Sequence, residues 1–117
     1  MKFNFVENSL IKNLTLINGA SPYFGGGIYT NYSDIILENL TIRNNYGQWL
    51  GGGIYSSYSS IDLQDVIIDG NSAYGQGAGV YADNSSINLS NVVIKNNFID
   101  DPTYGGSAGM HLINTST

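Results

Sequence analysis

Few side chains in this sequence could act as acids, bases or metal ligands. The chain has nine Asp and Glu, four Lys and Arg, one histidine (His111) and no cysteine. A glycoside hydrolase needs two carboxyl groups facing one cleft at about 5–9.5 Å, and a hard cation needs several oxygen ligands together. Asp62 lies on a predicted strand and Asp65 at the turn that follows it, in a column of asparagines, and Asp100-Asp101 precedes Pro102, a combination typical of turns. We therefore predict no catalytic residue, no metal site and no cofactor.

A second group of side chains is suited to binding. Tyrosine and tryptophan occur in segments rich in glycine and serine, where their rings offer a large contact area with a polar group to a sugar or a protein partner. The candidate ligand-binding residues are Tyr23, Tyr46, Trp49, Tyr74 and Tyr104. The alternative is that these rings only pack over the edge of the fold.

A sequence repeat must position these rings. The segment 25–29, Gly-Gly-Gly-Ile-Tyr, recurs at 51–55 and, as Gly-Ala-Gly-Val-Tyr, at 77–81, so that equivalent positions are separated by a constant interval of twenty-six. The chain is therefore a repeat array. The aromatic candidates fall on one edge of each repeat, between an asparagine turn and the glycine motif. One insertion, which contains Asp100 and Asp101, lengthens this edge in the last repeat.

Apolar and polar residues alternate within each repeat, which predicts β-strands. Two short strands flank Asn39, and a third runs through the glycine motif. Because equivalent residues of stacked coils lie about 4.8 Å apart, the core should consist of columns of like residues. These columns are Ile11, Leu37, Leu63 and Leu89; Leu14, Leu40, Val66 and Val92; Leu16, Ile42, Ile68 and Ile94; and Ile28, Ile54, Val80 and Met110.

Polar and aromatic residues form columns as well. Two columns at turns suit amide ladders, namely Asn13, Asn39, Asp65 and Asn91, and Asn18, Asn44, Gly70 and Asn96. Several asparagines also fit the N-glycosylation pattern, as in Asn39-Leu40-Thr41, but in a chain this rich in Asn, Ser and Thr we favour the structural interpretation. His111 should extend an aromatic column of Phe3, Tyr29, Tyr55 and Tyr81.

One column carries charges of alternating sign on the outer face. Arg43, Asp69 and Lys95 follow one another at the repeat interval. We interpret them as an exposed ladder of ion pairs, each worth about 0–1 kcal/mol.

A leucine-rich repeat is the competing architecture. The segment 37–45 satisfies its consensus, and the repeat interval lies within the range known for that family. That fold then needs a helix or compact turn, whereas the segment 46–53 contains four glycines, each of which costs a helix about 1 kcal/mol. The glycines favour a third strand.

The unit Ile-x-Leu-x-Asn-Val-x-Ile-x-x-Asn, followed by Gly-Gly-Ile-Tyr, resembles the repeats of right-handed parallel β-helix proteins. It is similar to the Gly-Gly-x-Ile repeats of polymorphic outer-membrane proteins and adhesin-like proteins, although Ile42, Ile68 and Ile94 stand where those repeats have phenylalanine. The resemblance implies an all-β fold: a right-handed single-stranded parallel β-helix of about four coils, with three short strands per coil. Residues 1–117 should be a segment of a longer solenoid, because neither end carries a recognisable cap.

The resemblance leaves two functions open. The first is a non-catalytic structural or adhesin-like module of a surface or secreted protein, located outside the cell. The second is a fragment of a carbohydrate-active enzyme, because β-helix polysaccharide lyases pair a calcium-binding acidic cluster with a basic residue. Asp69 beside Arg43 and Lys95 is the nearest approach to such a pair, but it lacks acidic companions.

Net charge and hydropathy limit the partners. A formal charge of −5 and a pI near 4.3 argue against nucleic acid. No apolar run approaches the ~18 residues of a membrane helix, so we expect no membrane insertion by this segment. The expected partners are glycans or surface proteins through the aromatic loops, and adjoining coils or a second copy through the uncapped ends.

Overall fold

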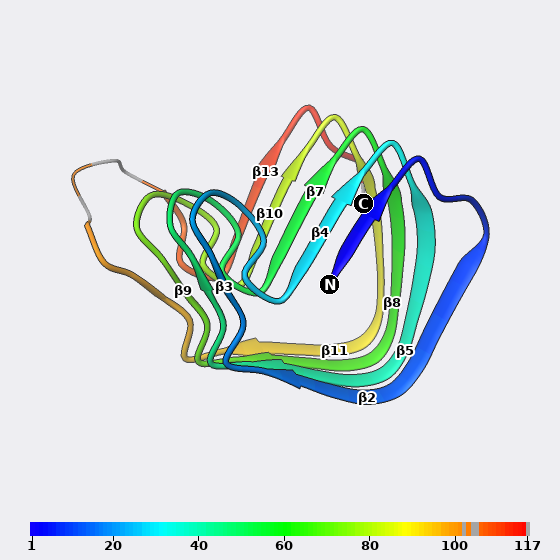
Figure 1. Cartoon of the computed structure of the whole chain (residues 1–117), viewed down its shortest axis with the longest axis horizontal. Coiled ribbons are helices and arrows are strands. Elements are labelled where there is room, and N and C mark those ends of the chain that lie inside the picture. Colours follow the sequence, from blue (N-terminus) through cyan, green and yellow to red (C-terminus); the bar gives the residue numbers. More distant parts are fainter. Residues whose placement is uncertain (102, 104–105, 117) are drawn as a thin grey trace.

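The chain forms a parallel β-solenoid of stacked coils. The computed structural model describes residues 1–101, 103 and 106–116. Its strands form three parallel sheets that wind around one core (Figure 1). The first sheet contains β1 (Lys2–Asn4), β4 (Ile28–Asn31), β7 (Ile54–Ser57), β10 (Val80–Asp83) and β13 (Met110–Ile113). The second contains β2 (Ser9–Ile17), β5 (Asp34–Arg43), β8 (Ser60–Asp69) and β11 (Ser86–Lys95). The third contains β3 (Ala20–Ser21), β6 (Tyr46–Gly47), β9 (Ser72–Ala73) and β12 (Phe98–Ile99).

The repeat interval sets the register of the sheets. Leu37 pairs with Leu63 and Leu63 with Leu89, so each strand lies beside its equivalent in the next coil. The predicted core columns are confirmed in the middle of the array, where Leu37, Ile54 and Ile68 have no exposed surface. Burying each such side chain contributes about 1.5–3 kcal/mol.

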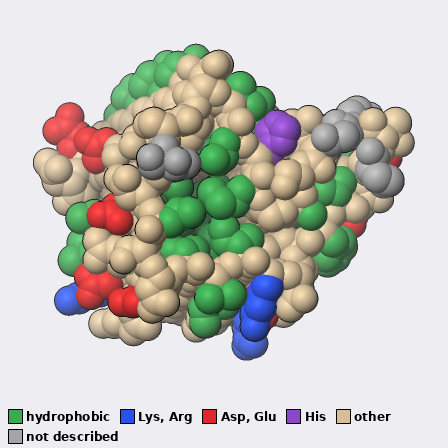
Figure 2. All heavy atoms as spheres, turned by 180° about the vertical axis from the view of Figure 1, so that it is seen from behind, with side chains coloured by type: hydrophobic (Ala, Val, Ile, Leu, Met, Phe, Trp, Pro, Cys, Tyr) green, Lys and Arg blue, Asp and Glu red, His purple; other side chains and the backbone are tan. Residues whose placement is uncertain are grey.

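Burial decreases toward the first and last coils. Leu14 and Leu89 were predicted to be core residues but are 40% and 44% exposed, because each is covered by a neighbouring coil on one side only. Val92, Ile94 and Met110 are only partly buried against the core cluster. Figure 2, which looks from behind the view of Figure 1, shows hydrophobic side chains grouped at the centre of that face.

The strands divide the coil differently from the sequence prediction. The two strands predicted on either side of Asn39 are one strand, β5, which bends at this residue with φ 54. The strand predicted to run through the glycine motif begins directly after it, at Ile54 in β7. The third sheet consists of two-residue strands, such as β6, in a segment predicted to be a loop.

The first coil departs from the regular repeat interval. Lys2 pairs with Tyr29 and Phe3 with Thr30, so each partner lies one position later than the repeat would place it. The prediction that Phe3 begins the aromatic column is therefore wrong. The first coil has one more residue than the second in the turn before the long strand, since Ser9 pairs with Ile35 at the regular interval. Phe3 turns inward and packs against the core.

The predicted asparagine columns are mainly turn positions. All eight of their residues have positive φ, a conformation that Asn, Asp and Gly adopt at the lowest cost. In the first column, Asn39 Nδ2 donates to Asn13 Oδ1 at 2.9 Å, and Asn91 Nδ2 donates to Asp65 Oδ1. The second column cannot form a continuous ladder, because Gly70 interrupts it.

The buried asparagine ladder lies one residue later than predicted. Asn45 Nδ2 donates to Asn71 Oδ1 and Asn71 Nδ2 to Asn97 Oδ1, both at 3.0 Å. Each of these side chains also donates to a backbone oxygen of the preceding coil, for example Asn71 to Ile42 at 2.9 Å. Each Oδ1 accepts a backbone N–H as well, so the ladder satisfies groups that the turn leaves unpaired.

A serine ladder performs the same function at the opposite corner. Ser33 N–H donates to Ser59 Oγ at 3.0 Å, and Ser59 N–H donates to Ser85 Oγ at 3.2 Å. All three serines are buried. The sequence prediction missed this column, although its members recur at the repeat interval.

Candidate binding surface

The aromatic candidates lie on loops that stack from coil to coil. Each loop joins a two-residue strand of the third sheet to the glycine motif of the next coil. Trp49 N–H donates to Tyr23 O at 2.8 Å, and Gly75 N–H donates to Trp49 O at 2.9 Å. These bonds hold the loops in register, and we name the segments 22–24, 48–50 and 74–76 the loop edge.

Three of the five predicted site residues belong to the loop edge. The side chains of Tyr23 and Trp49 are 64% and 41% exposed. Trp49 meets Tyr74 edge to face, with ring centroids 5.7 Å apart and an interplanar angle of 88°. Their arrangement leaves a surface that a ligand could contact from solvent.

The other two predicted residues do not join this group. Tyr46 belongs to strand β6 and is half-buried. Its backbone crosses close to Gly26, where an added Cβ would lie 2.4 Å from Tyr46 O. Tyr104 lies outside the described residues.

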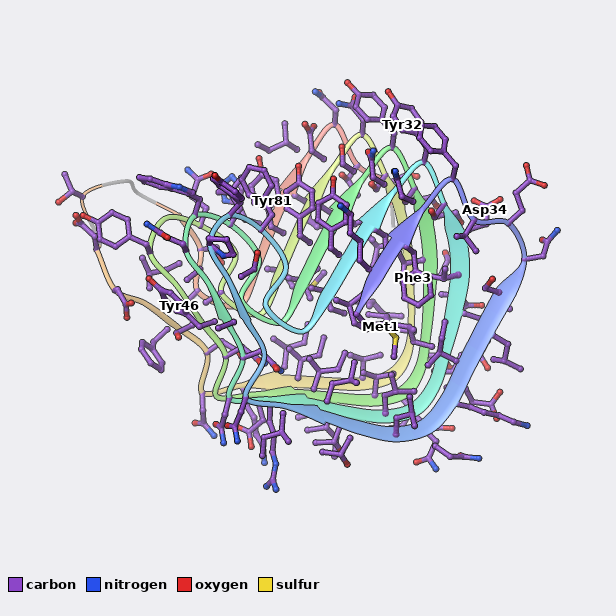
Figure 3. All side chains as sticks on the ribbon, in the orientation of Figure 1. Met1, Phe3, Tyr32, Asp34, Tyr46 and Tyr81 are labelled. Carbon is purple, nitrogen blue, oxygen red and sulfur yellow. The ribbon has the colours of Figure 1, made fainter. Side chains whose placement is uncertain are left out.

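The loop edge folds back onto a stack of rings on the first sheet. Tyr29, Tyr55, Tyr81 and His111 follow one another with centroids 5.3–5.6 Å apart, and this tyrosine stack confirms the predicted position of His111. Phe24 stacks on Tyr55 at 4.7 Å. Figure 3 shows Tyr81 on the side of β10 that faces the loops.

Burial affects two tyrosines in the middle of the tyrosine stack. Desolvation raises the pKa of both Tyr55 and Tyr81 above the usual tyrosine value. At the start of the stack, Lys2 Nζ lies 5.2 Å from the centroid of the Tyr29 ring, within the range of a cation–π contact.

A cavity of about 370 Å³ lies between the first loop and the start of the tyrosine stack. It is lined by Tyr23, Phe24, Tyr29, Lys2 and Ser21, together with the glycine motif of the second coil. Three aromatic residues, a serine and a lysine thus line one concave surface. Such a mixture of apolar and polar groups is typical of small-ligand sites.

One acidic residue of the inserted loop accepts a local hydrogen bond. Thr103 N–H donates to Asp101 Oδ1 at 2.9 Å. Hydrogen bonds from Thr103 and then from Tyr74 lower the pKa of Asp101 below the usual aspartate value. Among residues 1–101, 103 and 106–116, no three His, Cys, Asp or Glu side chains come close enough together to hold a metal ion.

The charged column also occupies its predicted place. Arg43 pairs with Asp69, and Asp69 with Lys95, on adjacent strands of the second sheet. Asp69 Oδ1 accepts a hydrogen bond from Asn96 Nδ2 at 2.9 Å.

The sequence prediction missed a second aromatic group, at the corner between the first and second sheets. Phe5, Tyr32 and Tyr58 stack with centroids 5.2 and 4.9 Å apart and interplanar angles of 1° and 7°. We name these three residues the corner stack. Their signal in the sequence is that Tyr58 follows Tyr32 at the repeat interval.

The corner stack stands on strained backbone. Phe5, Tyr32 and Tyr58 have φ of 54, 47 and 47. Bulky residues rarely adopt this conformation, and it costs about 1–2 kcal/mol per residue. Stacking returns about 0.5–1.5 kcal/mol for each of the two pairs, which is less than the backbone cost of the three residues.

The family of the chain is shown by a match that covers its whole length. A model of the right-handed β-helix region matches residues 1–117. The chain belongs to the right-handed β-helix family. This β-helix has the predicted fold, about four coils of parallel strands, and the leucine-rich-repeat alternative is wrong. Comparison with curated proteins and with solved structures gave no match. The described part of the β-helix contains no helix that could cross a membrane.

Proposed function

We propose that this β-helix is a non-catalytic, adhesin-like module of a surface or secreted protein, and that its loop edge contacts glycans. The observation that carries the proposal is the exposed rings of Tyr23 and Trp49 on successive loops, with the half-buried Tyr74 packed edge to face against Trp49. Aromatic rings bind sugars through their apolar faces, while the tyrosine hydroxyls supply hydrogen bonds. The cavity beside Tyr23 adds a concave subsite to the same edge.

The rigid β-helix supports this role. Backbone hydrogen bonds between successive loops fix the spacing of the rings before a ligand arrives. Preorganised groups lose less entropy on binding, which raises affinity for a given contact area. A structural module that displays fixed loops at one edge therefore suits recognition of a repeating polymer.

Replacing Trp49 by Ala should weaken glycan binding about tenfold, which corresponds to about 1.4 kcal/mol. The expected cause is loss of the largest exposed ring on the loop edge. A glycan array with the whole chain identifies the ligand, and calorimetry then compares the variant with the parent chain.

Ile67→Ala is the matched control, because Ile67 is also about 40% exposed but lies on the outer face of β8. It should leave binding unchanged. Equal losses in the two variants, or no glycan bound by the parent chain, would contradict the proposal.

A fragment of a polysaccharide-cleaving enzyme is the second candidate. Asp100 and Asp101 lie on the inserted loop, and the hydrogen bond between Asp101 and Tyr74 ties that loop to the loop edge. Calcium-dependent binding of an oligouronide that is lost in the double variant Asp100→Asn, Asp101→Asn would favour this function. Cleavage of the same polymer by the chain would establish it.

The half-exposed apolar residues of the outer coils suit adjoining β-helix coils or a second copy. Leu14 in the first coil and Leu89 in the fourth have such surfaces. Light scattering over a range of concentrations tests whether the chain associates with itself.

A further inference from the structure

The corner stack ends beside an open groove. Tyr58 stacks on Tyr32 through one ring face, and its other face points toward the following coil. The equivalent residue there is Asn84, whose side-chain amide donates to Asp83 Oδ1 at 2.9 Å. No described ring therefore continues the stack, and Tyr58 borders a shallow groove of about 670 Å³.

The groove is lined by groups that form hydrogen bonds. Beyond Tyr58, its lining includes the carboxylate of Asp34, the hydroxyls of Ser60 and Ser86, and the amide of Asn114. Ser59 and Ser85 also border it, but their hydroxyls already donate to backbone oxygens within the serine ladder. Figure 3 shows Tyr32 and Asp34 on the same corner, with Tyr32 projecting away from the solenoid.

Folding alone does not explain the aromatic residues at this corner. Tyr58 is 51% exposed and has a φ of 47, whereas Asn84 and Asn114 hold the same turn with φ of 48. Asparagine adopts this conformation more readily than tyrosine. The chain thus places a bulky, exposed ring where its own later coils use the residue better suited to the backbone, which points to a role outside folding.

Charge and lining together select the class of ligand. The chain has a net charge of −5, and Asp34 adds a carboxylate within the groove, so uronates and phosphates are disfavoured. An apolar ligand would cover the Tyr58 ring but leave the surrounding polar groups without partners. A neutral sugar has no negative charge and satisfies both the ring and the polar groups. Its C–H face can pack on the Tyr58 ring while its hydroxyls bond to Asp34, Ser60 and Asn114.

We propose that the groove beside Tyr58 is a second binding site, specific for neutral oligosaccharides. It is separate from the loop edge, since it lies at the corner between the first and second sheets. The Tyr58 ring forms its apolar platform, and Phe5 and Tyr32 hold that ring in place from behind.

The test uses the whole chain with Trp49→Ala to weaken binding at the loop edge, and it assigns binding to the groove by the residues whose signals shift. Neutral oligosaccharides of hexoses and of N-acetylhexosamines serve as probes, with an oligogalacturonate as the acidic comparison. Binding is measured by calorimetry and located by chemical-shift changes. We expect at least one neutral probe to bind and to shift the signals of Tyr58 and Asn114, and the oligogalacturonate not to bind.

Tyr58→Asn is the decisive variant, because it installs the residue that the later coils use at the same turn. It should weaken binding at least about tenfold while leaving the unfolding midpoint equal or higher. Tyr58→Phe retains the ring and should retain most of the affinity, and Tyr32→Asn should have a smaller effect than Tyr58→Asn. Unchanged binding in Tyr58→Asn, preference for the acidic probe, or no binding of neutral probes at millimolar concentration would overturn the proposal.

Discussion

Replacing Gly52 by Ala should destabilise the β-helix by about 3 kcal/mol. An added Cβ would lie 2.1 Å from Ser72 O and 2.6 Å from Ala78 O. Both atoms belong to backbone, so neither can rotate away as a side chain would. Relief requires the coils to separate locally, which weakens the bond from Gly53 N–H to Ala78 O. Denaturant unfolding followed by circular dichroism measures the change.

Gly109→Ala is the matched control for this substitution. Its added Cβ would meet only Ile94 Cγ2, at 3.9 Å, which is ordinary contact. We expect stability to stay within about 0.5 kcal/mol or to rise slightly, because alanine reduces the entropy of the unfolded chain. In the fourth coil, Ala78 is accommodated at the position equivalent to Gly52, where the next loop is longer. Equal effects of Gly52→Ala and Gly109→Ala would contradict the close approach of the coils.

Replacing Asn71 by Ala should cost about 3–5 kcal/mol. Asn71 is fully buried, and its Oδ1 accepts bonds from both the backbone and the side-chain N–H groups of Asn45. Its Nδ2 donates to Ile42 O and Asn97 Oδ1. Removing the side chain leaves several buried groups unpaired, each at a cost of about 1–3 kcal/mol, although these costs are not fully additive.

The control for Asn71 is Asn88→Ala, on the exposed face of β11. Substitutions at such surface positions usually change stability by less than about 0.5 kcal/mol. The two variants should therefore differ clearly in their free energy of unfolding, measured by thermal and by denaturant unfolding. If the free energies of unfolding of Asn71→Ala and Asn88→Ala differed by less than about 1 kcal/mol, the buried ladder would not contribute to stability as the geometry indicates.

The repeat interval allowed most of the fold to be predicted. Stacked coils bring like residues together, so the column of Leu37 and Leu63 could be assigned without coordinates. The pairing of β1 with β4 could not be predicted, because one extra residue in a short turn does not change the pattern of apolar residues. Phe3 therefore matched Tyr29 in the sequence while pairing with Thr30 in the solenoid.

The asparagine ladder shows how two requirements can be confused in a sequence. The pairs Asn44-Asn45, Gly70-Asn71 and Asn96-Asn97 occupy the same turn in successive coils. The first position accepts glycine because it needs positive φ, and the second retains asparagine because its side chain is used. Comparison of the three pairs separates the two roles, whereas alignment of asparagines alone selected the first position.

The positions of the candidate binding residues could be predicted only in part, for a related reason. Tyr23, Trp49 and Tyr74 could be placed on stacked loops because glycine-rich segments mark those loops. Tyr46 was assigned to the same group, but it lies in a two-residue strand, which is too short to show a period. The corner stack escaped notice because its rings stand at a tight turn, and a turn residue is normally expected to be small or polar.

The longer last loop has a consequence for how such a protein can diversify. Val80 pairs with Met110 across the inserted loop, yet β10 and β13 align as regularly as β7 and β10, whose partners are separated by the ordinary repeat interval. The pairing of the strands is thus unaffected by the length of the loop that connects successive coils. New recognition segments could be grafted into this edge one rung at a time, so that reach and specificity change while the supporting scaffold is inherited intact.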